Sequence, residues 1–362
     1  MTCILLSCCI SPSCPANVRG RHEDTMIIHT LKKSVALLSM AAFFPLCSAH
    51  AQTQPTAVSG TDTQGQVQKT SSITIGKSVS VVSGRLSLGL LNGDADEIVY
   101  NPGNGAKVSQ LEWDLDNVAM LGAGISISPK SWLRLNGDFW INISEGNGAM
   151  NDYDWLLPTS DWSDWSYHED TEVDQVIMLD LSADLTFHTT QHAQFFGILG
   201  FKRDSFEWTA RGGDFVYSVN GFRDTTGSIP GDLQVVSYEQ TFLFPYIGLG
   251  FEVDFAPVTF TGRIIGSTLV DVEAEDTHYL RGLMFDDSFE TGSMIAVDLG
   301  VSYHLSKRLH VTGGLHYQNY DEVQGSTVIT EQSTGLSYLV EGDAAGADNS
   351  STMILATISY DF

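Results

Sequence analysis

The clearest alternation of apolar and polar residues lies in residues 132–143. Its apolar positions are Leu133, Leu135, Phe139, Ile141 and Ile143, and its polar positions are Arg134, Asn136, Asp138 and Asn142. Successive side chains of a β-strand point to opposite faces, so this segment predicts a strand with one apolar and one polar face. Residues 352–362 alternate in a similar way and end on aromatic Phe362, which is typical of a strand that closes a membrane barrel.

Segments with this period of two recur ten times along the chain, which is an even number. They span about 79–91, 107–127, 132–145, 172–188, 195–210, 235–252, 258–272, 292–305, 308–320 and 351–362. Bacterial outer-membrane barrels have an even number of antiparallel strands, with an apolar outer face. We therefore expect an all-β fold, a ten-stranded antiparallel transmembrane β-barrel over residues 78–362.

The connections between these segments alternate between short and long. The short ones are 128–131, 189–194, 254–257 and 306–307, and the long ones are about 92–106, 146–171, 211–234, 273–291 and 321–350. In outer-membrane barrels short turns face the periplasm and long loops face the outside. We therefore expect long extracellular loops that carry the functional site. A ten-stranded barrel filled by inward side chains is too narrow for a general porin, and a small channel is disfavoured for the same reason.

The chain before the barrel divides into three expected segments. Residues 26–51 have the form of a secretory signal, with two lysines, an apolar stretch and a small-x-small cleavage sequence. We expect residues 1–25 to be an over-extended start, and residues 52–77, rich in Gln, Thr, Ser and Gly, to be a flexible periplasmic tail. All five cysteines precede residue 52, so no disulfide is expected in the exported protein. A lipid anchor at Cys47 is disfavoured, because bulky Leu46 stands where a lipidation signal needs a small residue.

The charge of the exported part is strongly negative. Residues 1–51 hold four basic and two acidic residues, so their removal from 18 basic and 44 acidic residues leaves 14 and 42, a net charge of −28. Such a surface excludes nucleic acid as a partner. It attracts cationic peptides or basic protein loops through its summed field.

Two aspartates, Asp152 and Asp154, form the first candidate site. They lie in the second long connection, and their carboxylates share one face if the backbone is extended there. Paired carboxylates hold a water or a shared proton, because like charges at short range do not both ionise freely. Asp94 and Asp96 have the same spacing, so solvated loop residues and loose binding of a divalent cation stay open as alternatives.

An aspartate and a histidine, Asp276 and His278, form the second candidate site in the fourth long connection. A carboxylate two residues from an imidazole orients the ring and stabilises its protonated form, as a general base acting on water requires. Both candidate sites are expected at the same rim, which makes a shared cleft possible. Strict counting by two from Val258 puts Asp276 and His278 on the lipid-facing side. We therefore expect a β-bulge near Leu269 and Val270.

A third group, Asp164, Ser166 and His168, contains the residue types of a serine hydrolase. Nothing around it has the form of a nucleophile elbow, and residues at i, i+2 and i+4 are not expected to align as a relay. We interpret the group as loop polarity that lines the cleft.

Several segments of the chain are similar to signatures of one family of membrane enzymes. They are 107–113 (Lys-Val-Ser-Gln-Leu-Glu-Trp), 210–213 (Ala-Arg-Gly-Gly), 221–224 (Gly-Phe-Arg-Asp) and 245–249 (Pro-Tyr-Ile-Gly-Leu). On these segments the chain resembles the omptin family of outer-membrane proteases over residues 78–362. The resemblance implies a location in the bacterial outer membrane, with the active site facing the extracellular side.

The resemblance also implies roles for four residues. Asp152 and Asp154 match the family's aspartate couple, and Asp276 and His278 match its Asp-His dyad. The implied mechanism is direct attack by a water held between the two pairs, with His278 as general base and with neither a metal nor an acyl-enzyme.

Family members cut between basic residues and use two acidic groups to bind the residue before the cut. Glu97 matches the first acidic group, whereas the second position is Ala274 in this chain, which puts a strict dibasic preference in doubt. Neighbouring Glu273 and Glu275 lie on the opposite strand face. Family members also bind lipopolysaccharide, at positions that match Phe201, Arg203, Ser205 and Thr241 here. The usual dependence on this lipid is therefore expected to be altered or absent. No other cofactor is expected.

Two functions remain after these observations. The first is a surface endopeptidase that cleaves cationic peptides or basic protein loops, with outer-membrane lipid or lipopolysaccharide around it. The second is a catalytically silent adhesin or binding barrel, which Ala274 and the changed lipid positions favour. The four filled catalytic positions favour the protease.

Overall fold

The computed structural model describes residues 82–158 and 161–362. The expected segments 1–25 and 26–51, and the tail 52–77, lie outside the described residues, so their predicted roles stay predictions. No helix long and apolar enough to cross a membrane occurs in the described part of the chain.

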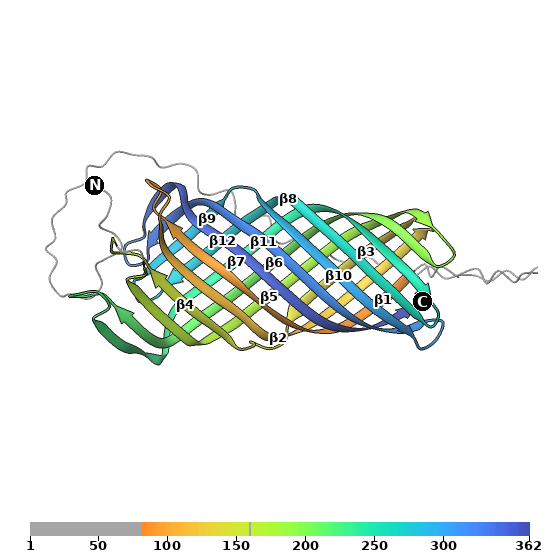
Figure 1. Ribbon diagram of the computed structural model, residues 1–362, viewed down its shortest axis with the longest axis horizontal. Helices are drawn as coiled ribbons and strands as arrows, with labels where there is room; N and C mark the ends of the chain where they lie inside the picture. The colour runs from red at the N-terminus through yellow and green to blue at the C-terminus, as the bar shows by residue number, and fades with distance from the viewer. Residues whose placement is uncertain (1–81, 159–160) are drawn as a thin grey trace, which may run out of the picture. The chain divides into compact units, whose positions relative to one another are not determined.

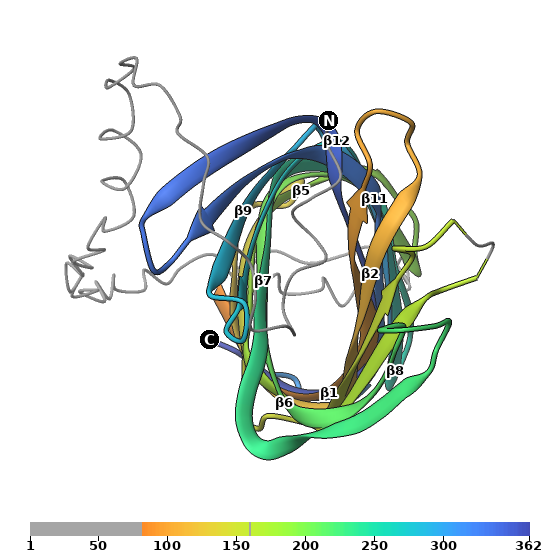
Figure 2. The same ribbon diagram turned by 90° about the vertical axis from the view of Figure 1, so that its left-hand side faces the viewer.

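The described chain forms one closed antiparallel sheet (Figure 1). Its strands are β1 (Val82–Tyr100), β2 (Lys107–Lys130), β3 (Leu133–Asn142), β4 (Gly148–Asp154), β5 (Asp164–Thr189), β6 (Ala193–Tyr217), β7 (Thr225–Phe255), β8 (Val258–His278), β9 (Leu283–Phe289), β10 (Gly292–His304), β11 (Leu309–Glu331) and β12 (Leu336–Asp361). Strand β1 pairs with both β2 and β12, which closes the ring seen end-on in Figure 2.

Ten strand positions make up this ring, as the sequence predicted. Strands β3 and β4 both pair with β2 and β5, and they are two parts of one position. Strands β9 and β10 likewise share one position between β8 and β11. The predicted ten-stranded antiparallel transmembrane β-barrel is therefore confirmed.

The prediction of long loops was wrong in form. The segments expected as loops are mostly strand, and the connections at that end shrink to residues 101–106, 155–163, 218–224, 279–282 and 332–335. The predicted strands ended where the outer face stops being apolar, yet backbone pairing does not depend on lipid contact. The barrel wall therefore continues well beyond the apolar belt, and functional residues expected on loops lie on paired strands.

Most outward apolar residues lie on the parts of the strands nearest the short turns and the C-terminus. On β1, for example, exposed Leu86, Leu88 and Leu90 alternate with inward residues, while outward Asp94 and Asp96 follow further along the strand. An apolar outer band with polar residues beyond it is the pattern of a membrane-spanning segment. The band therefore marks the part of each strand that lies in lipid.

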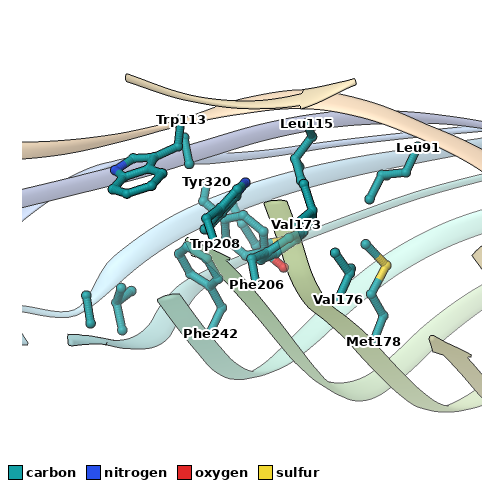
Figure 3. Packing of buried hydrophobic residues seen from close by; sticks show 14 of the residues in the cluster. Leu91, Trp113, Leu115, Val173, Val176, Met178, Phe206, Trp208, Phe242 and Tyr320 are labelled. Carbon is teal, nitrogen blue, oxygen red and sulfur yellow. The ribbon is translucent and has the colours of Figure 1, made fainter. Parts of the chain in front are cut away.

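Aromatic side chains fill the barrel just beyond this band (Figure 3). The rings of Trp113 and Tyr238 stack with centroids 5.5 Å apart, Trp208 stacks on Tyr238 at 6.1 Å, and Phe242 stacks on Tyr320 at 3.9 Å. All five side chains are almost fully buried. This layer forms a floor under the open end of the barrel.

A β-bulge in β8 occurs where the sequence required one. Between Gly266 and Asp271 strand β8 has one residue more than its partner β7 has between Ile247 and Leu243. The hydroxyl of Ser267 donates to the Pro245 carbonyl at 2.7 Å and accepts from the Leu269 amide at 3.0 Å. Beyond the bulge the face that had pointed to lipid points inward, so the prediction is confirmed.

Candidate active site

The Asp276 and His278 side chains lie on the inward face at the end of β8. Val270, Val272 and Ala274 precede them on the same buried face, so the bulge directs the whole row into the barrel. His278 Nε2 is 3.1 Å from Asp276 Oδ2, and the two residues are only 8% and 4% exposed. The ring of Phe285 on β9 meets the imidazole edge-on at 5.4 Å. The imidazole is thus held by a carboxylate at one nitrogen and by an aromatic ring at its side.

The Asp152 and Asp154 side chains lie on strand β4 and not on a loop. Strand β4 pairs with β2, where Leu111 faces Asp152 and Ser109 faces Asp154. The two aspartates share the inward face with buried Met150, and the Ser109 hydroxyl donates to Asp152 Oδ1 at 3.4 Å. The strand pairing therefore fixes the spacing that the sequence only made possible.

The two candidate pairs meet across the mouth of the barrel. Strand β4 is separated from β8 by β5, β6 and β7, so the pairs stand on different walls. The charges of Asp152 and His278 act on each other, and Asp152 also acts on Asp276. The structure therefore brings all four predicted residues into one cleft, beyond the membrane-spanning part of the strands.

Burial sets the protonation of the dyad. It lowers the pKa of His278 to about 4, so the imidazole is neutral at neutral pH and able to accept a proton. Burial raises the pKa of Asp276 to about 7, and a hydrogen bond with Glu97 lowers it. Burial, and then the neighbouring Asp276, raise the pKa of Glu97 well above its usual range. Burial and the neighbouring carboxylate thus favour the protonated form of Glu97 beside the dyad.

Burial and mutual repulsion set the protonation of the aspartate couple. Burial raises the pKa of Asp154 to about 8, and the charge of Asp152 raises it further. Burial also raises the pKa of Asp152. Burial and mutual repulsion therefore favour a couple that retains a proton between its two carboxyl groups.

Glu97 on β1 completes the inner wall of the cleft. Its carboxylate, that of Asp276 and the His278 ring each have one ligand atom within 4.8 Å of the others. This spacing would suit a metal ion, which would compete with a proton for the same three side chains. Glu97 is 4% exposed, and its Oε2 atom has no hydrogen-bond donor.

Arg281, in the turn between β8 and β9, places a positive charge near these acids. It offsets part of the burial-induced rise in the pKa of Asp152 and Asp154. Its side chain is exposed at the turn, so solvent screens part of this effect. Arg281 thus favours the ionised form of the aspartate couple.

The group Asp164, Ser166 and His168 lies on β5 and only two of its members interact. The Ser166 hydroxyl and His168 Nε2 are 2.9 Å apart, and His168 Nδ1 bonds to the Gly212 carbonyl. The Asp164 carboxylate instead accepts from the Ser163 hydroxyl at 2.6 Å and from the Ser218 amide at 2.9 Å. These three residues form no relay. Ser166 is buried directly opposite Asp152 across the β4–β5 pair, on the same face of the sheet, and His168 is buried beside it.

Residues 78–362 match the Omptin family, and known relatives match over most of their length. The plasminogen activator of Yersinia pestis is 31% identical over 277 residues, which are 76% of this chain and 88% of that protein. The outer membrane protease OmpP of Escherichia coli is 28% identical and covered to 90%, with 78% of this chain.

The chain belongs to the omptin family. The crystal structure of the outer membrane protease OmpT from Escherichia coli superimposes on this omptin with a TM-score of 0.75 at 25% identity, over 78% of this chain and 96% of OmpT. OmpP and OmpT are outer membrane proteases by name, and OmpT has the same barrel. This omptin is accordingly an outer-membrane protease with peptide or protein substrates.

The position of Ala274 in this omptin is buried and faces Asp287 across the β8–β9 pair. Sequence reasoning considered Glu273 and Glu275 for the missing acid, set them aside because they lie on the opposite strand face, and missed Asp287. Strand β9 lay inside a segment expected to be a loop, so the partner of Ala274 was not assigned. Phe285, Asp287 and Phe289 are spaced by two, as on one face of a strand, but this spacing does not identify the partner strand.

The positions expected to bind lipopolysaccharide carry a different network in this omptin. Phe201 is exposed, while the Ser205 hydroxyl donates to Glu239 Oε1 at 3.1 Å and accepts from Thr241 at 3.3 Å. Acidic residues lie directly opposite one another across four strands at this level, namely Glu207, Glu239, Glu275 and Asp286. Carboxylates repel lipid phosphates, so this outer face is unlike an anion-binding one.

Proposed function

We propose that this omptin is an endopeptidase in which His278, oriented by Asp276, activates a water that attacks the peptide bond directly. The observation that carries the proposal is the convergence of the Asp276–His278 dyad and the Asp152–Asp154 couple in one cleft. The two pairs come from different strands and lie on different walls of the barrel. We further propose that this cleft faces the extracellular side, because the short turns lie at the other end of the barrel.

The proposed reaction begins with His278. Its Nε2–H donates to Asp276, which leaves Nδ1 free to take a proton from water. The water oxygen bonds to the carbonyl carbon, and ionised Asp276 stabilises the imidazolium that forms. The C–N bond then breaks as His278 returns the proton to the leaving amine. General base catalysis of this kind contributes roughly 10²- to 10⁴-fold in rate.

The aspartate couple has a complementary role in the proposal. Ionised Asp152 accepts a hydrogen bond from the attacking water and holds it opposite His278. The proton kept by Asp154 provides a donor for the negative charge that develops on the carbonyl oxygen. Neither a metal nor an acyl-enzyme takes part in this scheme.

The proposed substrates are cationic peptides or basic protein loops. A net charge of −28 on the exported part attracts them, and buried Glu97 offers a carboxylate beside the dyad. The acidic outer face supports the further proposal that activity does not require lipopolysaccharide.

Mass-spectrometric mapping of cuts in a mixed peptide pool tests the proposed function. The protein is refolded in lipid and compared with His278→Ala and with the control His192→Ala, which changes an exposed histidine at the opposite end of the barrel. We expect the same cuts from the wild type and the control, and none from His278→Ala. Cuts that persist without His278 would refute the mechanism. An absence of cuts in the wild type, with and without lipopolysaccharide, would favour a binding barrel instead.

Serine chemistry is the competing mechanism that the structure makes worth testing, because Ser166 bonds to His168. A serine-directed phosphonylating reagent distinguishes the two. We expect no inactivation and no covalent adduct on Ser166, which is 3% exposed. An adduct with loss of activity would replace His278 by Ser166 at the centre of the mechanism.

A further inference from the structure

Two buried carboxylate oxygens near the dyad lack hydrogen-bond donors. They are Glu97 Oε2 on β1 and Asp287 Oδ1 on β9. The charges of the two side chains act on each other, and both act on Tyr238 in the aromatic floor. In the part of the chain that the structure describes, neither carboxylate forms an ion pair with a lysine or arginine.

Asp287 points into the barrel because of its position on β9. Two residues earlier the Phe285 ring contacts His278, and two residues later Phe289 packs against the hydrophobic core. Side chains two apart on a strand share a face, so Asp287 shares the inward face of both phenylalanines. The directly opposite residue on β8 is Ala274, whose methyl group leaves room beside the Asp287 carboxylate.

The surroundings of Asp287 do not neutralise it. The Thr327 hydroxyl on β11 lies close enough to lower the pKa of Asp287, but no hydrogen bond of ordinary geometry satisfies Oδ1. Burial outweighs this effect and raises the pKa of Asp287 to about 7. Two buried carboxyl groups near each other are costly to ionise without a cation, and a cation brought by a ligand would favour their ionised forms.

The position of Glu97 also indicates which residue of a substrate would carry such a cation. Its carboxylate is within 4.8 Å of ligand atoms of both Asp276 and His278. A side chain bound between Glu97 and Asp287 therefore belongs to a residue next to the bond that His278 hydrolyses. Lysine and arginine are the two residues whose head groups match paired carboxylates.

We propose that Asp287 is a specificity-determining residue, which with Glu97 binds the cationic side chain of the substrate residue adjacent to the cut. The Asp287 carboxylate lies on β9, directly opposite Ala274, and takes the role of the acid that position 274 lacks. This inference rests on the proposed protease function. It predicts that the preference for basic residues is retained although position 274 carries no acid.

Matched peptides test the proposal. A substrate taken from the cut map is compared with the same peptide in which citrulline, a neutral analogue, replaces the arginine next to the cut. We expect Asp287→Asn to lower kcat/KM for the arginine peptide roughly 10- to 100-fold, as for loss of one charge-assisted partner, and to leave the citrulline peptide nearly unchanged. Asp286→Asn is the matched control, because it removes the same charge from the neighbouring position, on the opposite face of β9.

A double variant keeps the test independent of folding defects. Ala274→Asp combined with Asp287→Asn returns one carboxylate to the pocket from the opposite strand, and we expect it to restore the arginine preference. An unchanged ratio of arginine to citrulline rates in Asp287→Asn would overturn the proposal. An equal change in Asp286→Asn would do the same, because it would indicate only a general charge effect.

Binding separates this inference from the proposed function. Fluorescence anisotropy with the uncleaving His278→Ala variant measures the affinities for the two peptides without any cutting. We expect the arginine peptide to bind more tightly, and Asp287→Asn in this background to remove the difference. If the wild type cuts nothing while this discrimination is present, the protease function fails and the pocket stands. Equal binding of both peptides before Asp287 is changed would overturn the pocket.

Discussion

His278 Nε2 lies 3.1 Å from Asp276 Oδ2, two residues earlier on the same face of β8. That face is inward only because one extra residue enters β8 between Gly266 and Asp271. Below the bulge the same parity carries Phe260 and Ile264 to the lipid-facing side. A local irregularity of the strand therefore converts a membrane-facing row into a catalytic one.

Replacing Asp276 tests the role of the carboxylate in that bond. Asp276→Asn keeps the shape but removes the negative charge that stabilises the imidazolium and fixes the tautomer. We expect kcat to fall roughly 10²- to 10⁴-fold with little change in KM. Steady-state kinetics on one cut peptide measures both parameters. A loss confined to KM would mean that Asp276 binds substrate and does not orient the base.

A one-residue deletion beyond the bulge tests the parity argument. Deletion of Glu273, which is exposed on β8, would turn residues 274–278 over and direct Asp276 and His278 outward. We expect cleavage to be abolished while the membrane part of the barrel still folds, as β-sheet circular dichroism would report.

A matched deletion controls for shortening as such. Gly335 lies in the exposed turn between β11 and β12, far along the chain from the bulge. Its deletion is expected to leave cleavage intact. Full activity after deletion of Glu273 would refute the claim that strand parity beyond the bulge sets the inward direction of the dyad.

The stability of the barrel is expected to fall as pH rises from about 4 to about 8. The folded protein holds a proton on Asp154, whose pKa is raised to about 8, whereas the unfolded chain loses it near 3.8. The stabilisation is complete below pH 3.8 and is lost as pH rises through 8, with a slope of up to about 1.4 kcal/mol per pH unit.

The variant Asp154→Asn checks this window. This substitution removes the titrating carboxyl group. The change of the thermal midpoint with pH, measured in detergent, should therefore be smaller by the contribution of one proton. Asp276, with a pKa raised to about 7, keeps part of the slope in the same direction. An unchanged slope in the variant would show that Asp154 is ionised in the folded protein at neutral pH.

The outer face predicts independence from lipopolysaccharide. Glu239 occupies the network of Ser205 and Thr241, and further acids flank it, so phosphates are not attracted there. We expect cleavage rates in phospholipid bilayers to change less than about twofold when lipopolysaccharide is added, since exposed charge interactions are weak. A stimulation of tenfold or more would show that the lipid is bound by groups other than these.

Much of the fold was predictable because it depends on a period of two and on the parity of the strands. The ten strand positions and the bulge near Leu269 followed from counting residues. The expectation that Asp152 and His278 share one rim followed from the alternation of short and long connections, and their roles from the family resemblance. The length of the wall did not, because strand pairing above the membrane leaves no apolar outer face to detect. The strands β4 and β9 were therefore expected as loops.

Asp287 could not be assigned from the sequence for a related reason. Its importance depends on the β8–β9 register, which sets it opposite Ala274, and that register follows from the hairpin turn at residues 279–282. In a chain with 44 acidic residues, one more aspartate carries no signal until its partner strand is known.

A double-mutant cycle tests most directly whether the dyad and the couple act as one catalytic unit. Cleavage of one peptide is measured over long incubations for His278→Ala, Asp152→Asn and the double variant. Residues that serve the same activated water are not additive, so we predict that the double variant loses little more activity than the worse single variant. If the activity of the double variant instead fell by the product of the two single-variant factors, the account would be contradicted.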